Sequence, residues 1–94
     1  MRIIQSRSFA TKVKRFTREE KLILDQQVRE ILDHPTIGQA KKGDLRGVCV
    51  HKFKIQTVQY LLSYRFVGAA LELIMLGPHE NYYRDLKTYL KNRP

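Results

Sequence analysis

The sequence predicts an α+β domain in which two N-terminal helices pack on one face of a curved antiparallel sheet and a short helix follows. Two observations lead to this prediction. Apolar residues recur with a helical period of about 3.6 before Gly47 and with a strand period of 2 after it. Glycine and proline fall at separate points between the apolar segments, and the length of 94 residues suits a single domain over residues 1–94.

The first elements are a strand and two helices. A short strand is expected over Arg2–Gln5. A basic amphipathic helix follows, because three apolar residues have the spacing i, i+4, i+7: Phe9, Val13 and Phe16. Thr17 and Glu20 have the spacing of a capping box, which begins a second helix. This helix ends near Pro35, and its apolar stripe consists of Leu24, Val28, Ile31 and Leu32. Consecutive helices predict a helical hairpin.

Three strands and a last helix are expected after Gly47. β-branched and aromatic residues dominate Val48–Ile55, Val58–Val67 and Ala70–Leu76. Two-residue turns between them give an antiparallel meander. One face of this sheet is then apolar and needs the helices: Phe53, Ile55, Val58, Tyr60, Leu62, Tyr64, Phe66, Leu71, Leu73 and Met75. The last helix is expected over His79–Lys91.

The charge is strongly positive. Lysine and arginine number 18 against 9 acidic residues, which gives a net charge of +9. Such an excess favours anionic partners, either phosphate backbones or an acidic protein. No apolar run approaches the ~18 residues that cross a bilayer, and a lone cysteine, Cys49, suits a reducing cytoplasm. We therefore expect a cytoplasmic protein with no membrane contact. No metal-ligand spacing or phosphate-binding glycine loop is present, so neither metal nor cofactor is expected.

The opposite face of the predicted sheet gathers polar side chains. Lys52 and Lys54 point the same way, Gln59 lies across from Lys54, and the last strand ends beside them at His79. Cleavage of RNA by its own 2′-hydroxyl needs a proton acceptor, charge stabilisation at phosphorus and a proton donor. Lysine, histidine and tyrosine side chains supply these functions, and imidazole groups ordinarily titrate near neutral pH.

Other polar residues have a structural interpretation beside a functional one. His51 alternates onto the helix-covered face, and His34 is expected at a helix end. Arg65 is either a phosphate ligand or the ion-pair partner of Glu72 across the strands. Tyr82 and Tyr83 are candidates for stacking on RNA bases, although Tyr83 also suits a core position.

The order of elements and four sequence strings resemble the RelE/ParE superfamily of bacterial toxin-antitoxin toxins over nearly the whole chain. The strings are Gly43–Gly47, His51–Ile55, Tyr60–Arg65 and, most specific, Leu76–Lys87. The resemblance implies a RelE-like fold. It also implies, for the ribosome-dependent members, metal-independent cleavage of messenger RNA in the decoding site.

The resemblance implies catalytic positions at Lys52, Lys54, His79 and Tyr83. Lys54 or His79 is the candidate general base. RNA contacts are expected from Gln59, Arg65, Tyr82, Arg84 and Lys87. Many members carry an arginine on the middle strand, where this chain has Gln59, so one phosphate-stabilising charge is missing there.

Three functions stay open at this point. The favoured one is a ribosome-dependent messenger RNA endoribonuclease, because an inhibitor has no need of proton-transfer residues. The second is a ParE-type inhibitor of DNA gyrase, since that type shares the fold without a nuclease site. The third is an inactive protein that only binds its antitoxin. For each, an acidic antitoxin is the expected protein partner; the nuclease would also bind the ribosome and messenger RNA.

Overall fold

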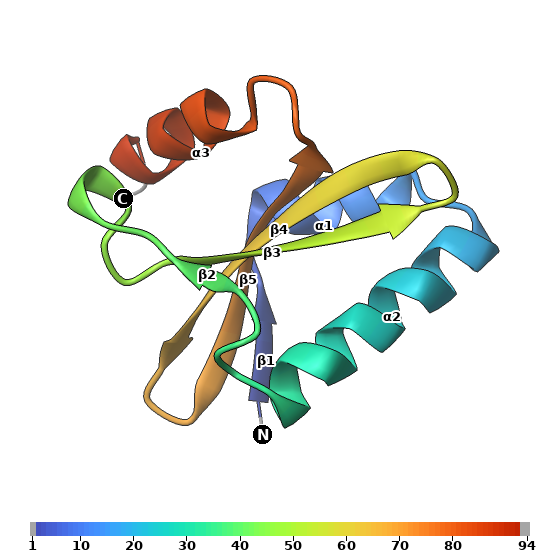
Figure 1. Ribbon diagram of the computed structural model, residues 1–94, viewed down its shortest axis with the longest axis horizontal. Coiled ribbons are helices and arrows are strands. Elements are labelled where there is room, and N and C mark those ends of the chain that lie inside the picture. The colour runs from blue at the N-terminus through green and yellow to red at the C-terminus, as the bar shows by residue number, and fades with distance from the viewer. Residues whose placement is uncertain (1, 93–94) are drawn as a thin grey trace.

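The computed structural model describes residues 2–92. Along the chain the elements are β1 (Arg2–Gln5), α1 (Arg7–Lys14), α2 (Arg18–Asp33), β2 (Gln39–Ala40), the 3-10 turn η1 (Gly43–Leu45), β3 (Cys49–Ile55), β4 (Val58–Val67), β5 (Ala70–Pro78) and α3 (Tyr82–Lys91). The described strands form one twisted sheet in the order β1-β5-β4-β3-β2 (Figure 1). The α+β class is therefore confirmed. No helix within residues 2–92 combines the length and apolarity needed to cross a membrane.

The central meander has the predicted turns. Ile55 pairs with Val58 and Val67 pairs with Ala70, so both connections are two residues long. Each turn has a residue in the left-handed region, Gln56 with φ 56° and Gly68 with φ 59°. Such φ values match the twist of the flanking strands, which explains why these short turns join them.

The sheet differs from the prediction at both edges. β1 pairs with β5 in the parallel direction, with Arg2 opposite Ala70, so the sheet is mixed rather than purely antiparallel. Between β1 and β5 the chain passes through α1, α2 and the other three strands, and β5 then runs in the same direction as β1. At the other edge β2, which the sequence pattern did not predict, pairs with β3 over two residues.

A β-bulge in β5 changes which side chains face the helices. Ser63 pairs with Met75 while the next residue, Tyr64, pairs with Leu73, so Ile74 is the extra residue. One inserted residue reverses the alternation beyond it. Leu76 therefore takes the helix-facing position that was predicted for Met75, and Met75 lies with Ile74 on the other face.

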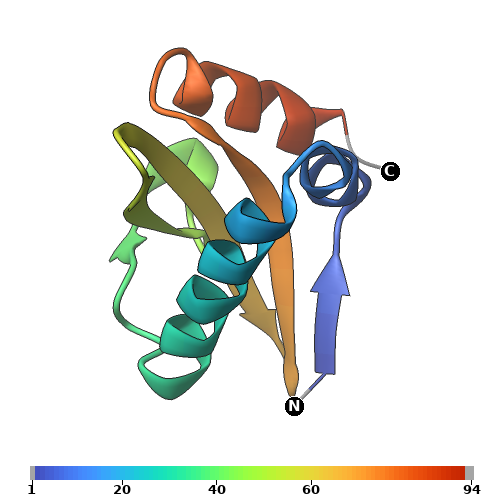
Figure 2. The same cartoon turned by 90° about the vertical axis from the view of Figure 1, so that its right-hand side faces the viewer.

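The helices α1 and α2 cover one face, as predicted, but they do not form a hairpin. α1 packs on β5 and α2 packs on β3, and the two axes diverge in Figure 2. Phe9, Leu24 and Ile31 from these helices join Phe53, Leu62 and Tyr64 of the sheet in the main core. The predicted capping box is present, since the Thr17 N–H donates to Glu20 Oε1 at 2.7 Å and the Glu20 N–H donates to Thr17 Oγ1 at 3.2 Å.

α3 covers part of the opposite face, over a second core that the sequence did not reveal. Figure 1 shows α2 and α3 on opposite sides of the sheet. Tyr82 and Leu86 of α3 pack with Leu45, Leu61 and Ile74. The expected basic surface is thus limited to the part of this face beyond α3, where Lys52, Lys54 and Gln59 are exposed.

The segment between α2 and β2 is fastened to the sheet by one tyrosine. The Tyr64 hydroxyl donates to the Pro35 carbonyl at 2.8 Å and accepts from the Gly38 N–H at 3.0 Å. A Cβ at Gly38 would lie 2.6 Å from that hydroxyl oxygen, so only glycine fits. This attachment fixes where β2 and the following Lys41 lie.

Candidate functional site

Three predicted site residues lie in one row across the sheet. Lys54 on β3 is opposite Gln59 on β4, and Pro78 at the end of β5 is opposite Tyr60. His79 therefore follows at the level of Gln59. Strands are about 4.8 Å apart, so the row from Lys54 to His79 is about 10 Å long. The side chains of Lys54 and His79 are both exposed.

His79 belongs to a loop and not to the helix in which it was expected. α3 begins at Tyr82, three residues later than predicted, because Asn81 has a left-handed backbone with φ 59°. The Tyr82 N–H still donates to the His79 carbonyl at 3.2 Å. The histidine is thus held against the start of α3 while its side chain is exposed.

Tyr83 connects this row to a cation that the sequence analysis missed. Its ring lies edge-to-face with the imidazole of His79, at 6.2 Å between centroids. The ammonium group of Lys41 lies 4.8 Å from the centre of the same ring and also donates to Gln39 Oε1 at 3.0 Å. Nothing in the local pattern at Lys41 pointed to Tyr83, because the contact depends on β2 and on the path of α3. Lys41 is thus the cation that the structure places on this ring, while Lys52 is exposed on β3 opposite Leu61.

Tyr82 is a structural residue, which corrects its predicted stacking on bases. It is 3% exposed, and its hydroxyl lies 2.7 Å from the Met75 carbonyl and 2.9 Å from Ser63 Oγ. Burial raises the pKa of this hydroxyl, so it stays protonated and donates. A base would have to displace the core to stack on the face of this ring, which leaves Tyr83 as the more exposed aromatic of the two.

The remaining predicted RNA contacts are spread out. The Arg65 Nε donates to Glu72 Oε1 at 2.7 Å, so Arg65 forms the ion pair with Glu72 that was one of its two predicted roles. Arg65 lies six residues from Gln59 on β4, a separation of about 20 Å. Arg84 is exposed beside Asp85, with 3.6 Å between Nε and Oδ1, and Lys87 is exposed one turn beyond Tyr83.

The other two histidines lie away from the row. His51 is 9% exposed on the helix-covered face, and its Nε2 is 2.7 Å from Gln27 Oε1. Burial lowers the pKa of His51, while the nearby Glu30 acts in the opposite direction. His34 is the C-terminal capping residue of α2 and is exposed. Both positions agree with the structural interpretations made from the sequence.

One protein family and several solved structures match this chain. The family model described as "ParE-like toxin of type II bacterial toxin-antitoxin system" matches residues 3–87. No curated protein is similar enough to count as a match. Among solved structures, the intact E. coli RelBE toxin-antitoxin complex contains a chain with the same fold. The TM-score is 0.65 at 17% identity, over 84% of this chain and 96% of that one.

Proposed function

Since the chain belongs to the ParE-like toxins of type II bacterial toxin-antitoxin systems, we propose that it inhibits translation by cleaving messenger RNA on the ribosome. The observation that carries this proposal is the row of Lys54, Gln59 and His79, with Tyr83 against the histidine. In this proposal Lys54 and His79 act as the base and the acid, and Tyr83 supplies the stacking surface. The net charge of +9 favours binding to ribosomal and messenger RNA.

The proposed reaction uses the RNA's own 2′-hydroxyl. Lys54 or His79 takes the hydroxyl proton as the 2′-oxygen attacks phosphorus, and the P–O5′ bond breaks. Lys52 stabilises the negative charge on the phosphate oxygens, and the other of the two proton-transfer groups protonates the leaving 5′-oxygen. The products are a 2′,3′-cyclic phosphate and a 5′-hydroxyl. Tyr83 stacks on a neighbouring base.

The test is cleavage of messenger RNA on programmed ribosomes, read by primer extension. Loss of a general acid or base costs about 100-fold to 10,000-fold in rate, so His79→Ala should nearly abolish cleavage. His34→Ala removes an exposed histidine at the far end of α2 and should cleave normally. If a folded His79→Ala protein cleaves at the parent's rate, the histidine is structural and the mechanism is wrong. Analysis of the 3′ ends for the cyclic phosphate tests the reaction type independently.

Gyrase inhibition is the second candidate, and two observations favour it. The matching family is described as ParE-like, and the middle strand has neutral Gln59 where many members of the resembled superfamily carry an arginine. A supercoiling assay with purified gyrase separates the two functions. Inhibition of gyrase together with intact messenger RNA on programmed ribosomes would establish this candidate in place of the nuclease.

The proposed protein partner is an acidic antitoxin. One solved structure similar to this chain is a toxin-antitoxin complex, and the basic residues of α1 give an acidic segment a complementary surface. Co-expression with the product of the neighbouring open reading frame should relieve growth inhibition. Toxicity that no acidic partner relieves would contradict this assignment.

A further inference from the structure

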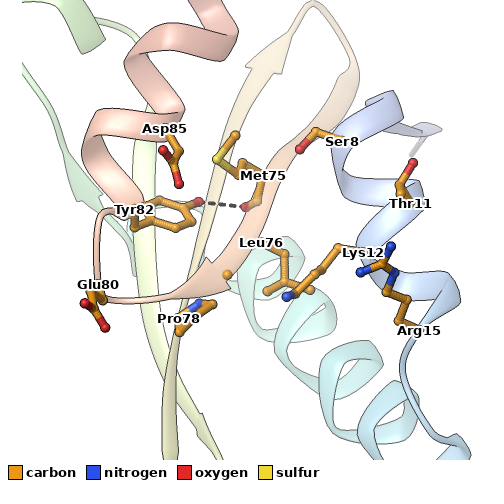
Figure 3. Close-up of a pocket in the computed structure, with 11 residues that line it drawn as sticks. Ser8, Thr11, Lys12, Arg15, Met75, Leu76, Pro78, Glu80, Tyr82 and Asp85 are labelled. Carbon is orange, nitrogen blue, oxygen red and sulfur yellow. Dashed lines mark hydrogen bonds between the residues drawn. The ribbon is translucent and has the colours of Figure 1, made fainter.

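A groove of about 370 Å³ separates α1 from the start of α3 (Figure 3). Its floor is the end of β5, from Met75 to Pro78. The pairing of β5 with β1 stops at Leu73, so on the edge turned away from β4 this stretch is flanked by the two helices instead of a strand. The groove lies on the other side of the Pro78–Tyr82 loop from the candidate site.

The α1 wall presents two hydroxyls and two cations on one stripe. Ser8, Thr11, Lys12 and Arg15 are spaced i, i+3, i+4, i+7, which places them on one side of the helix, and all four line the groove. Phe9 lies off this stripe and is buried in the main core. Hydroxyls and cations in this arrangement are the groups that bind phosphate.

The opposite wall carries two carboxylates, Glu80 and Asp85, both exposed. Within residues 2–92 no ion pair crosses the groove, and the 3.6 Å contact of Asp85 is with its neighbour Arg84. Cations therefore line one side of the groove and carboxylates the other, with no ion pair between them in the described part of the chain. A ligand that fits has an anionic group at one end and hydrogen-bond donors at the other. A nucleotide has both, as phosphate and as base amino groups.

One short segment of the chain lies between the groove and the candidate site and contributes residues to both. Pro78 and Glu80 line the groove, while His79 between them belongs to the site. Likewise the ring of Tyr82 lines the groove and touches, at 5.7 Å between centroids, the ring of Tyr83 in the site. A single strand of RNA that passes His79 can therefore reach the α1 groove by crossing this loop.

We propose that the groove is a second nucleotide subsite, which holds a residue of single-stranded RNA flanking the one in the candidate site. Lys12 and Arg15 bind its phosphate, and Glu80 and Asp85 accept hydrogen bonds from its base. Carboxylates accept from the cytosine N4 amino group, whereas uracil presents a carbonyl oxygen there. The subsite consequently favours cytosine over uracil. This inference rests on the proposed RNA-cleaving function.

The first experiment measures binding of a 2′-O-methylated, uncleavable RNA octamer to the purified protein by fluorescence anisotropy. The Lys12→Ala/Arg15→Ala variant should bind about tenfold more weakly. One neutralised phosphate contributes about 0.7 to the steepness of log K against log salt for single strands, so the slope should become shallower by about that amount. Lys14→Ala/Arg18→Ala removes the same charge outside the groove and should change neither quantity appreciably.

The outcomes separate this inference from the function on which it rests. If the two double variants behave alike, the effect is one of net charge and the subsite is wrong. If Lys52→Ala/Lys54→Ala weakens binding and the groove variant does not, the subsite fails while the nuclease proposal stands. If the unaltered protein does not bind the octamer, both fail. If the groove variant loses affinity for a polyglutamate peptide and keeps its RNA affinity, the groove binds acidic protein instead.

The second experiment tests base preference with octamers of cytosine and of uracil. The unaltered protein should bind the cytosine octamer several-fold more tightly. In Glu80→Gln/Asp85→Asn this ratio should approach one, because the amides lose the charge-assisted bonds. Glu19→Gln/Asp25→Asn, on the exposed surface of α2, should keep the ratio. An equal affinity of the unaltered protein for the two octamers would exclude the assigned role of the carboxylates.

Discussion

Replacing Tyr64 by phenylalanine removes a single oxygen atom that holds the α2–β2 connection. The hydroxyl makes two hydrogen bonds, to the Pro35 carbonyl and from the Gly38 N–H, while the ring packs in the main core. Each bond contributes about 0.5–1.5 kcal/mol net. The ring remains in place, so the expected loss in the free energy of unfolding is about 1–3 kcal/mol.

Urea denaturation followed by circular dichroism measures this loss, with the m value as a check that the transition is unchanged in extent. Tyr60→Phe is the matched control. It lies on the same strand and packs against Phe16 and Phe53, but no hydrogen bond of its hydroxyl occurs within residues 2–92. It should be close to neutral. Equal stability of Tyr64→Phe and the unaltered protein would show that the hydroxyl does not hold the connection.

A second substitution tests the same contact from the other side. Gly38→Ala places a Cβ 2.6 Å from the Tyr64 oxygen and 2.8 Å from a ring carbon, so the hydroxyl must move and both bonds weaken. In that background Tyr64→Phe should cost less than it does alone, because residues that share a contact are not additive. Additive losses in the double variant would contradict the assigned geometry.

Two further predictions concern α2 and the residue beneath it. Thr17→Ala removes the capping-box oxygen and should lower stability by about 1 kcal/mol in urea denaturation, whereas Thr17→Ser should retain it. Because burial lowers the pKa of His51, the unfolded chain binds a proton more readily than the folded one. The contribution of His51 to the free energy of unfolding is therefore fully present above its ordinary pKa of 6.5, and it decreases as the pH falls towards the lower pKa of His51 in the folded protein. His51→Gln should reduce the difference in the free energy of unfolding between pH 7.5 and pH 5.5, and His34→Gln should leave it unchanged. If the difference is the same in His51→Gln as in the unaltered protein, burial of His51 is not the cause of the pH dependence.

Local chemistry was sufficient to predict much of the fold. The two-residue turns set the register of β3 and β4, so the positions of Phe53 opposite Tyr60 and Lys54 opposite Gln59 followed from the sequence and are confirmed. The start of α2 was likewise predictable, because the two side chains of the capping box, Thr17 and Glu20, bond to each other's backbone within one turn. To place His79 beside Lys54 and Gln59, the prediction then required only the position at which β5 ends.

Features that depend on distant contacts were not predictable in this way. No local sequence signal marks the extra residue Ile74. The side chain of Met75, which follows it, was therefore predicted on the wrong face of the sheet. Tyr82 and Tyr83 are indistinguishable by composition, and only the second core shows that one is buried. The contact of Lys41 with Tyr83 exists because β2 and α3 meet over the same edge, which neither segment specifies alone.

The pairing of β1 with β5 has a consequence for how the protein is made. The Ser6 hydroxyl donates to the Ile74 carbonyl, 68 positions along the chain, and the Ser6 N–H donates to Leu73. Contacts of such sequence separation form late, and the N-terminal part of a chain emerges from the ribosome first. During synthesis β1 and α1 must wait for β5, and His79 and Tyr83 emerge later still. Until β5 has emerged, β1 has no partner strand. The row of site residues and the groove beside it form only after that.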